Sequence, residues 1–237
     1  MRGLMPAGWA ALLCVAPLGS ALAGDAATVT TTATACPGAA AWAAAHPEES
    51  EEAVARRDAA RSLTDPQLRA ELAQRFARDQ KARTAAVARP DNARAWRGVT
   101  LADESNFAWL QELVRTRGFP TAAQVGEQGV MHAWLLAHHA DRNRDFQAAL
   151  LPVLRQRAID GELGPSDFAR FTDRVLKGQG RPQYYGTQFS PAEWATPHFG
   201  LPDSASVREV EAHRQELGIM PLADYVCMMS EARKPRP

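Results

Sequence analysis

Polar side chains on one predicted helix are the first residues here whose types and spacing could support chemistry. Gln128, His132 and His139 lie within roughly 40° of one another at about 100° per residue, so they form one stripe on the segment from Thr121 to Ala140. Because an imidazole exchanges protons near neutral pH, His139 is a candidate general base or acid. An exposed polar face, or a core histidine bonded to a carbonyl, would have the same spacing.

A metal site is not expected on this helix. Zinc-binding helices usually place two ligands at positions i and i+4, whereas His132 and His139 are seven positions apart. His138 lies to one side of the stripe, and no pair of cysteines completes a ligand set. We therefore expect neither a bound metal nor another cofactor.

Two further polar groups follow along the chain. Asp173 and Arg174 form either a surface ion pair or, in a site, a guanidinium fork for an anion beside a carboxylate that orients a histidine. The segment from Gln183 to Gln188 holds two amides, two phenols, a hydroxyl and a glycine. These uncharged groups suit a polar ligand or a developing oxyanion, although they could equally cap helices and fill the core.

Other function classes lack their motifs. No GxSxG elbow, phosphate-binding P-loop or GxGxxG turn occurs, which disfavours serine hydrolases, nucleotide hydrolases and dinucleotide-binding enzymes. The 27 basic residues match the 27 acidic ones, so no basic excess points to nucleic acid or an anionic membrane. A glycosidase with two carboxylates stays open, because acidic residues are numerous.

The first 23 residues predict a secretory signal peptide. One basic residue, Arg2, precedes an apolar run from Ala7 to Pro17, and Ala21-Leu22-Ala23 is a cleavage pattern. The run is too short to span a bilayer, and no later run is longer, so we expect no membrane span and a periplasmic or secreted product. There Cys36 and Cys227 could form a disulfide or remain two free thiols.

The remaining sequence predicts an all-α fold, a compact orthogonal bundle of several helices. Capping residues, glycines and prolines divide the chain. They indicate helices from Pro47 to about residue 61 and over 66–87, 103–117, 121–140, 143–160, 167–177, 204–217 and 222–232. Residues 90–100 read as a loop, and residues 181–202 as one long irregular loop with at most a short strand near 184–189.

This pattern gives a simple domain organisation. Residues 24–62 are expected to be a disordered leader and an N-terminal helix, a spacer outside any site. One helical domain follows over residues 63–233, which is long enough for a single core, and residues 234–237 form a tail.

Several segments together resemble a bacterial family catalogued as domain-of-unknown-function family 6624, over about residues 68–225. The matching residues are Glu71-Leu72, Asp79-Gln80, Arg83, Asp103, Asn106, Gly118-Phe119-Pro120, Val125-Gly126, His139-Ala140-Asp141, Gln147, Asp173-Arg174, Gln183 to Gln188, Arg214, Gly218, Leu222 and Tyr225. Phe119 replaces the usual tryptophan, and His213 stands where a second arginine is common. The resemblance implies a helical fold and no established activity, and it favours His139 over His132.

From these residues we expect one polar pocket, where His139 acts as general base or acid, Asp173 orients it and Arg174 binds negative charge. Thr187 and Gln188 would donate hydrogen bonds to the transition state. The other expected ligand-binding residues are Asp79, Gln80, Gln183, Tyr185 and Arg214. The function would be hydrolysis or group transfer without a cofactor. A binding module for a peptide, a cell-wall fragment or a small polar solute is the alternative, and a structural network is a third interpretation.

Overall fold

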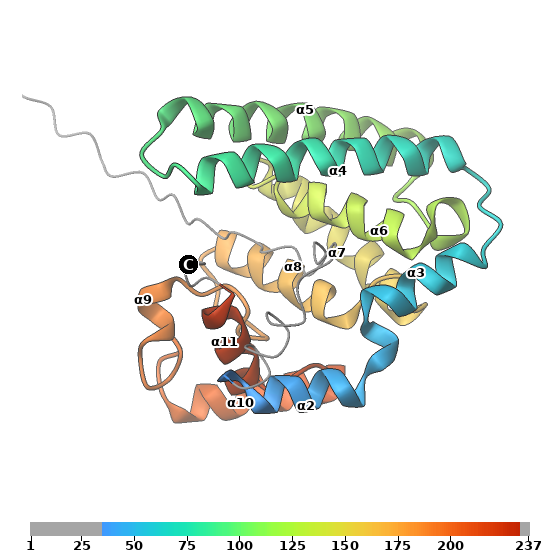
Figure 1. Ribbon diagram of the computed structural model, residues 1–237. Helices are drawn as coiled ribbons and strands as arrows, with labels where there is room; N and C mark the ends of the chain where they lie inside the picture. The colour runs from blue at the N-terminus through green and yellow to red at the C-terminus, as the bar shows by residue number, and fades with distance from the viewer. Residues whose placement is uncertain (1–34, 233–237) are drawn as a thin grey trace, which may run out of the picture.

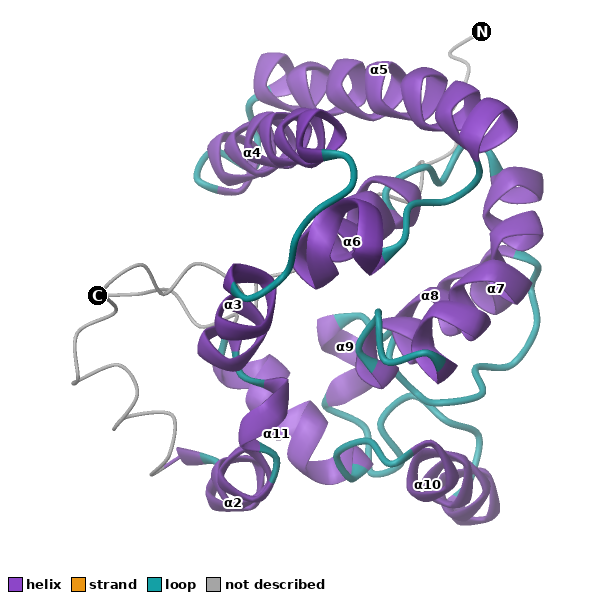
Figure 2. Cartoon of the chain, turned by 90° about the vertical axis from the view of Figure 1, so that its right-hand side faces the viewer, coloured by secondary structure: helices purple, strands orange, loops and turns teal. Residues whose placement is uncertain are grey.

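The computed structural model describes residues 35–232. The predicted signal peptide, the leader up to Thr34 and the tail from residue 234 lie outside the described residues. Within the described part the fold is all-α, as predicted, and it has no strand (Figure 2). None of the helices in residues 35–232 combines the length and apolar character needed to cross a membrane.

Five helices form the main core. Helices α4 (Pro66–Val87) and α5 (Ala93–Arg117) lie side by side along one edge, and α6 (Ala122–His138) packs beneath them (Figure 1). Helices α7 (Arg144–Ile159) and α8 (Pro165–Gly178) complete this core, and α7 continues through Pro152 without interruption. Their buried contacts include Leu72, Leu110, Trp134, Leu154 and Phe171.

The C-terminal part of the chain builds a second, smaller core. The segment predicted as an irregular loop contains the short helix α9 (Pro191–Trp194), which is followed by α10 (Ser204–Leu217) and α11 (Leu222–Glu231). Phe189, Val210, Leu222 and Val226 pack together there. The short strand predicted near residues 184–189 does not form, because these residues bond to side chains of other elements rather than to a neighbouring strand.

The prediction of a loop over residues 90–100 is wrong. Helix α5 begins at Ala93, where the Asn92 side chain accepts hydrogen bonds from the backbone N–H groups of Arg94 and Ala95. Val99 is buried, so packing stabilises this first part of the helix. As a consequence, Asp103, which the sequence predicts at the start of a helix, lies inside one.

The N-terminal segment is folded against the domain. It comprises α2 (Pro37–Ala45), a 3₁₀ turn (Pro47–Glu49) and α3 (Glu51–Ala59). A disulfide joins Cys36 to Cys227 in α11, which decides between the two alternatives left by the sequence. Asp58 accepts hydrogen bonds from the backbone N–H groups of Glu127 and Gln128, at a break in α6 where Gly126 has φ of 74°.

Candidate functional site

Three polar side chains meet between α4, α5 and the C-terminal end of α6. Asp79 comes from α4 and Asp103 from α5. His139 directly follows the last residue of α6 and is its C-terminal cap. One carboxylate oxygen of each aspartate and one ring nitrogen of His139 all lie within 4.8 Å of one another. With Arg83, which contacts both carboxylates, these residues form what we term the acid–base cluster.

The periodicity of each helix explains this meeting. Leu68, Leu72 and Asp79 lie on the buried face of α4, so the carboxylate points towards the core that the leucines fill. Helix α6 is buried along most of its length. Its C-terminal end places His139 where the ring contacts the Asp79 carboxylate. Four residues after Asp79, Arg83 projects from the same face of α4 and reaches Asp103.

Asp79 is the most constrained member of the cluster. Its carboxylate accepts hydrogen bonds from Gln80 Nε2 at 2.8 Å and Arg83 Nε at 3.2 Å. It lies 3.1 Å from His139 Nδ1. Burial raises the pKa of the Asp79 carboxyl, but the His139 hydrogen bond and the nearby positive charge outweigh it, so the pKa lies below its usual value. Asp79 is therefore ionised.

His139 is a neutral imidazole near pH 7. Burial lowers its pKa to about 4, although Asp79 acts in the opposite direction. Because ionised Asp79 can only accept a hydrogen bond, Nδ1 is assigned the proton and Nε2 the free lone pair. Within the described residues Nε2 is buried and has no hydrogen-bond partner.

Asp103 is the exposed member of the cluster, since 26% of its side chain is accessible to solvent. Burial of the remainder raises the pKa of Asp103 to about 7; Arg83 lowers it, and Asp79 adds to the increase. The carboxyl is thus close to half protonated at neutral pH. Such a group can donate or accept a proton without a large cost.

Arg174 is close to the cluster but already paired. Its Nε donates to Asp141 at 2.7 Å, a second guanidinium nitrogen contacts the other oxygen of Asp141, and Nη1 donates to Gln188 Oε1 at 3.3 Å. The bidentate pair with Asp141 occupies the fork predicted to bind a ligand. Arg174 still affects the site, because its charge lowers the pKa of His139.

Asp173 does not orient His139, contrary to the prediction; Asp79 is the carboxylate in that position. The buried carboxylate of Asp173 instead accepts hydrogen bonds from the backbone N–H groups of Tyr184, Tyr185 and Thr187 at 2.7 to 2.9 Å. It also accepts one from the Thr187 hydroxyl at 2.8 Å. Asp173 therefore anchors the loop that follows α8.

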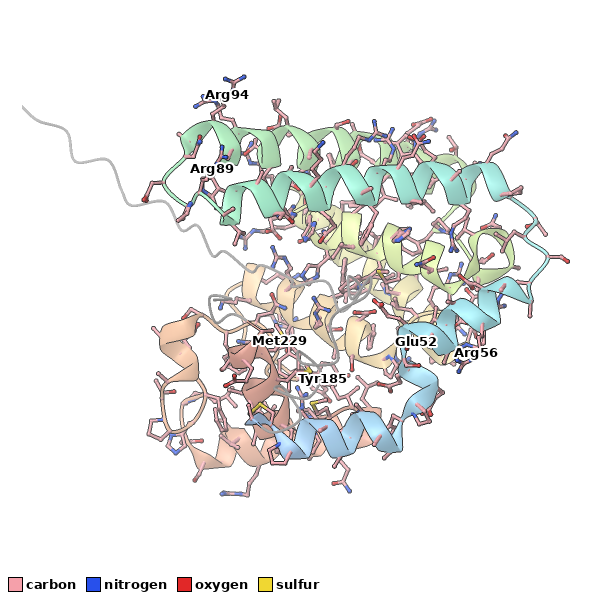
Figure 3. All side chains as sticks on the ribbon, in the orientation of Figure 1. Glu52, Arg56, Arg89, Arg94, Tyr185 and Met229 are labelled. Atoms are coloured by element: carbon pink, nitrogen blue, oxygen red, sulfur yellow. A yellow bond between two sulfur atoms is a disulfide. The ribbon has the colours of Figure 1, made fainter. Side chains whose placement is uncertain are left out.

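The other predicted loop residues are also committed to internal contacts. Thr187 donates to Asp173, Gln188 Nε2 donates to the Arg170 carbonyl, and Gln183 pairs with the backbone of Gln188. Tyr185 lies in the lower part of the molecule, away from α4 and α5 (Figure 3). The structure thus brings Asp79, Gln80 and His139 together and places Arg174 near enough to affect the pKa of His139. The loop residues are held by Asp173, by Arg170 and by one another.

Arg214 also holds the loop that follows α8, through a hydrogen bond to a backbone carbonyl. Its guanidinium donates at 2.7 Å to the carbonyl of Tyr185 and at 2.7 Å to that of Met220, and the side chain is buried. His213, which stands where a second arginine was expected, stacks on Tyr184 and bonds to its carbonyl. This pair therefore binds the backbone of the loop.

Three residues with a role at the site were not among those predicted for it: Arg83, Asp103 and Asp141. All three belong to the segments that carry the family resemblance, which was the available signal. The sequence predicts Asp103 at the start of a helix, because the first part of α5 is predicted as a loop. Asp141 and Arg83 resemble ordinary surface charges in the sequence.

Asp79, Asp103 and His139 are also the residues in the described part of the chain that could together hold a metal ion. A carboxylate, a second carboxylate and an imidazole form a mixed oxygen and nitrogen ligand set. Arg83 contacts both carboxylates and supplies positive charge at the same position.

A hollow of about 360 Å³ is lined by residues that follow Asp103 and His139 closely along the chain. Phe107 and Gln111 line it from α5, one and two turns after Asp103, and Arg142 to Phe146 line it from the segment after Asp141. The rings of Phe107 and Phe146 meet edge to face at 5.4 Å. The hollow thus offers aromatic and polar contacts outside the cluster.

A sequence profile of one protein family matches residues 66–234 of the chain. The family is described as a family of unknown function (DUF6624). No curated protein and no solved structure matches the chain.

Proposed function

The chain belongs to the family of unknown function DUF6624, and from its own residues we propose that it is an exported hydrolase or transferase that works by proton transfer without a cofactor. His139 is the general base and Asp103 the general acid. Asp79 orients His139, and Arg83 balances the charge of the two carboxylates. The residues that carry this proposal all lie in the matched part of the chain.

The proposal is carried by the pKa values of His139 and Asp103, which lie in the reverse of their usual order. A histidine ordinarily has a higher pKa than an aspartic acid. Here the pKa of His139 is about 4 and that of Asp103 about 7, and one donor atom of each residue lies within 4.8 Å of the other. Between these two values the imidazole is free to accept a proton while the carboxyl can donate one, as an acid–base pair requires.

The chemistry follows from these protonation states. His139 Nε2 takes a proton from water or from an acceptor hydroxyl as its oxygen attacks the substrate. Asp103 gives its proton to the leaving group, and solvent then restores both groups. Nε2 is buried, so side chains at its edge move when a substrate enters; Asp103, the exposed member, marks the entry side.

Two features support export. The predicted signal peptide covers residues 1–23, and the disulfide between Cys36 and Cys227 is a bond that persists in oxidising compartments. Expression of the full chain in a Gram-negative host, followed by mass spectrometry of the periplasmic fraction, tests this point. The expected product begins at Gly24 and lacks two thiol hydrogens; a full-length product retained in the cytoplasm would contradict it.

A binding module without turnover is the second candidate, and the hollow beside α5 and α7 favours it. Its lining combines two aromatic rings, an amide of Gln111 and an amide of Asn143, with charged groups around them. Such a surface suits a peptide, a cell-wall fragment or a small polar solute.

A thermal-shift screen of the chain from Gly24, followed by turnover assays on each ligand found, separates the two candidates. The screen covers peptides, cell-wall fragments and polar solutes. The enzyme proposal expects turnover that falls by at least about 100-fold in both His139→Gln and Asp103→Asn. Glu104→Gln, which removes the exposed carboxylate next to Asp103, is the matched control and should retain activity. Binding without turnover, equal in all four proteins, would establish the binding module instead.

A further inference from the structure

We infer that Asp79, Asp103 and His139 bind one divalent transition-metal ion, for which the guanidinium of Arg83 is the internal competitor. The ion and the proton-transfer chemistry use the same residues: the ion occupies the Asp103 carboxylate and, by binding Nδ1 of His139, moves the ring proton onto Nε2, the atom that would otherwise accept a proton. A bound ion therefore switches that chemistry off, a consequence that rests on the proposed function. The binding itself does not depend on it.

The spacing of the donor atoms fits a single ion. Zinc binds carboxylate oxygens and imidazole nitrogens at about 2.0 to 2.2 Å in tetrahedral geometry, so two donors on one ion are separated by roughly 3.5 Å. The three donor atoms here lie within 4.8 Å of one another. They come from three helices, and small side-chain rotations close the remaining gap.

His139 provides an observation independent of the carboxylates. Its side chain is only 2% exposed, and its Nε2 has no partner within the described residues. When an ion binds Nδ1, the nitrogen that faces Asp79, the proton on Nδ1 has to move to the other nitrogen. Nε2 is free to receive it, so the ring stays neutral and no hydrogen bond at Nε2 is lost.

The charges around the cluster favour an additional cation. Asp79 and Asp103 both contact the guanidinium of Arg83, so two carboxylates share one positive charge. Asp141, two positions after His139, is paired with Arg174 instead. The Arg83 side chain is 19% exposed, so its long stem can rotate towards solvent and leave both carboxylates to the ion.

The donor set selects the kind of ion. Two carboxylate oxygens and one imidazole nitrogen suit Zn²⁺, Co²⁺ or Mn²⁺. Calcium and magnesium prefer ligand sets made only of oxygen atoms. We therefore expect Zn²⁺ to bind and Mg²⁺ to leave the protein unchanged at the same concentration.

Calorimetric titration of Zn²⁺ into the tag-free, chelator-treated chain from Gly24 tests the inference. One site is expected, with Co²⁺ giving a visible absorption spectrum at the same stoichiometry. Asp103→Asn and His139→Gln should each weaken binding by more than about tenfold, since loss of even an outer hydrogen-bond partner can cost that much. Glu104→Gln should bind as the unmodified chain does, and Arg83→Met, which removes the competitor, should bind more tightly.

Three results would overturn the inference. The unmodified chain could fail to bind while Arg83→Met binds, which would make the guanidinium a permanent occupant. Binding could persist unchanged in Asp103→Asn, which would place the ion elsewhere. Absence of binding in every protein would also reject it. Asp103→Asn preserves the size of the side chain. If His139→Gln does not fold, the result for Asp103→Asn is sufficient to accept or reject the metal site.

These outcomes are separate from those of the proposed function. Turnover by the metal-free chain together with no Zn²⁺ binding rejects only the metal site. Zn²⁺ binding that depends on Asp103 and His139, in a chain that turns over none of its ligands, rejects only the proton-transfer enzyme.

Discussion

His139 Nδ1 lies 3.1 Å from a carboxylate oxygen of Asp79, and both side chains are almost completely removed from solvent. This contact fixes the orientation of the ring and leaves Nε2 as the free nitrogen. It also opposes the effect of burial on the ring, because a negative charge at this distance favours the protonated imidazole. The same contact links α4 to the end of α6.

Asp79→Asn should lower the pKa of His139 below its value of about 4, because the variant removes the charge that favours imidazolium. Two-bond ¹H–¹⁵N NMR spectra of the imidazoles, recorded during an acid titration, measure this pKa and the tautomer. His132, whose pKa burial also lowers to about 4, is the internal control and should be unaffected. A ring that titrates near its ordinary value of 6.5 would contradict the geometry.

Asp103→Asn should make the protein relatively more stable as the pH rises. The folded-state pKa is about 7 and the ordinary value 3.8, so between these values the folded chain holds a proton that the unfolded chain has released. The contribution of Asp103 therefore favours folding at low pH and is lost as the pH rises towards 7. Asparagine has no such dependence.

Urea denaturation of both proteins at several pH values checks this prediction. Between roughly pH 5 and 8 the free energy of unfolding of Asp103→Asn should gain about 2 kcal/mol relative to the unmodified chain. The buried histidines titrate in both proteins and cancel in this comparison. A difference that is independent of pH would show that Asp103 has an ordinary pKa.

The helices could largely be predicted from the sequence where local signals were complete. Asp65 and Pro66 mark the start of α4, and the apolar spacing that follows gives its buried face. The start of α5 has a capping residue, Asn92, but no apolar spacing follows it, because charged residues and Gly98 interrupt the pattern. Tertiary packing of Val99 stabilises this part of the helix instead. That one boundary concealed the place of Asp103 in the site.

Site geometry could be predicted less well, because it depends on contacts between distant segments. His139 was identified from its residue type, but its partner Asp79 is 60 positions away and Asp173 is equally acidic. The role of Asp173 depends on backbone N–H groups of a loop 11 to 14 positions later. Residue type and spacing do not show which backbone N–H groups of this loop point towards the Asp173 carboxylate.

Asp173→Asn should destabilise the fold by about 3 kcal/mol, because the amide nitrogen of asparagine faces donors and cannot replace the second carboxylate oxygen. Urea denaturation measures the loss. Asp160→Asn is the matched control, since Asp160 is exposed and accepts one side-chain hydrogen bond from Gln156; it should change stability by less than about 0.5 kcal/mol. Equal effects of the two variants would remove the anchoring role of Asp173.

Gly126→Ala should be more damaging than Gly218→Ala, although both glycines have φ near 70°. A Cβ atom at Gly126 would lie 2.5 Å from an oxygen of Asp58, whereas a Cβ atom at Gly218 meets nothing within 4 Å. Gly218→Ala should cost about 1 kcal/mol of backbone strain. For Gly126→Ala we expect about 3 kcal/mol, because displacement of Asp58 also removes its hydrogen bonds to Glu127 and Gln128.

A double-mutant cycle with Asp58→Ala separates the contact from the strain at Gly126 itself. If Asp58 is the obstacle, Gly126→Ala costs less in the Asp58→Ala background than in the unmodified chain. Additive costs would mean that backbone strain, together with Arg69 Nη1, which lies 2.6 Å from the same Cβ position, explains the effect without Asp58. Coupling would show that the N-terminal segment, outside the matched family region, holds the break in α6 in place, and thereby the helix that ends at His139.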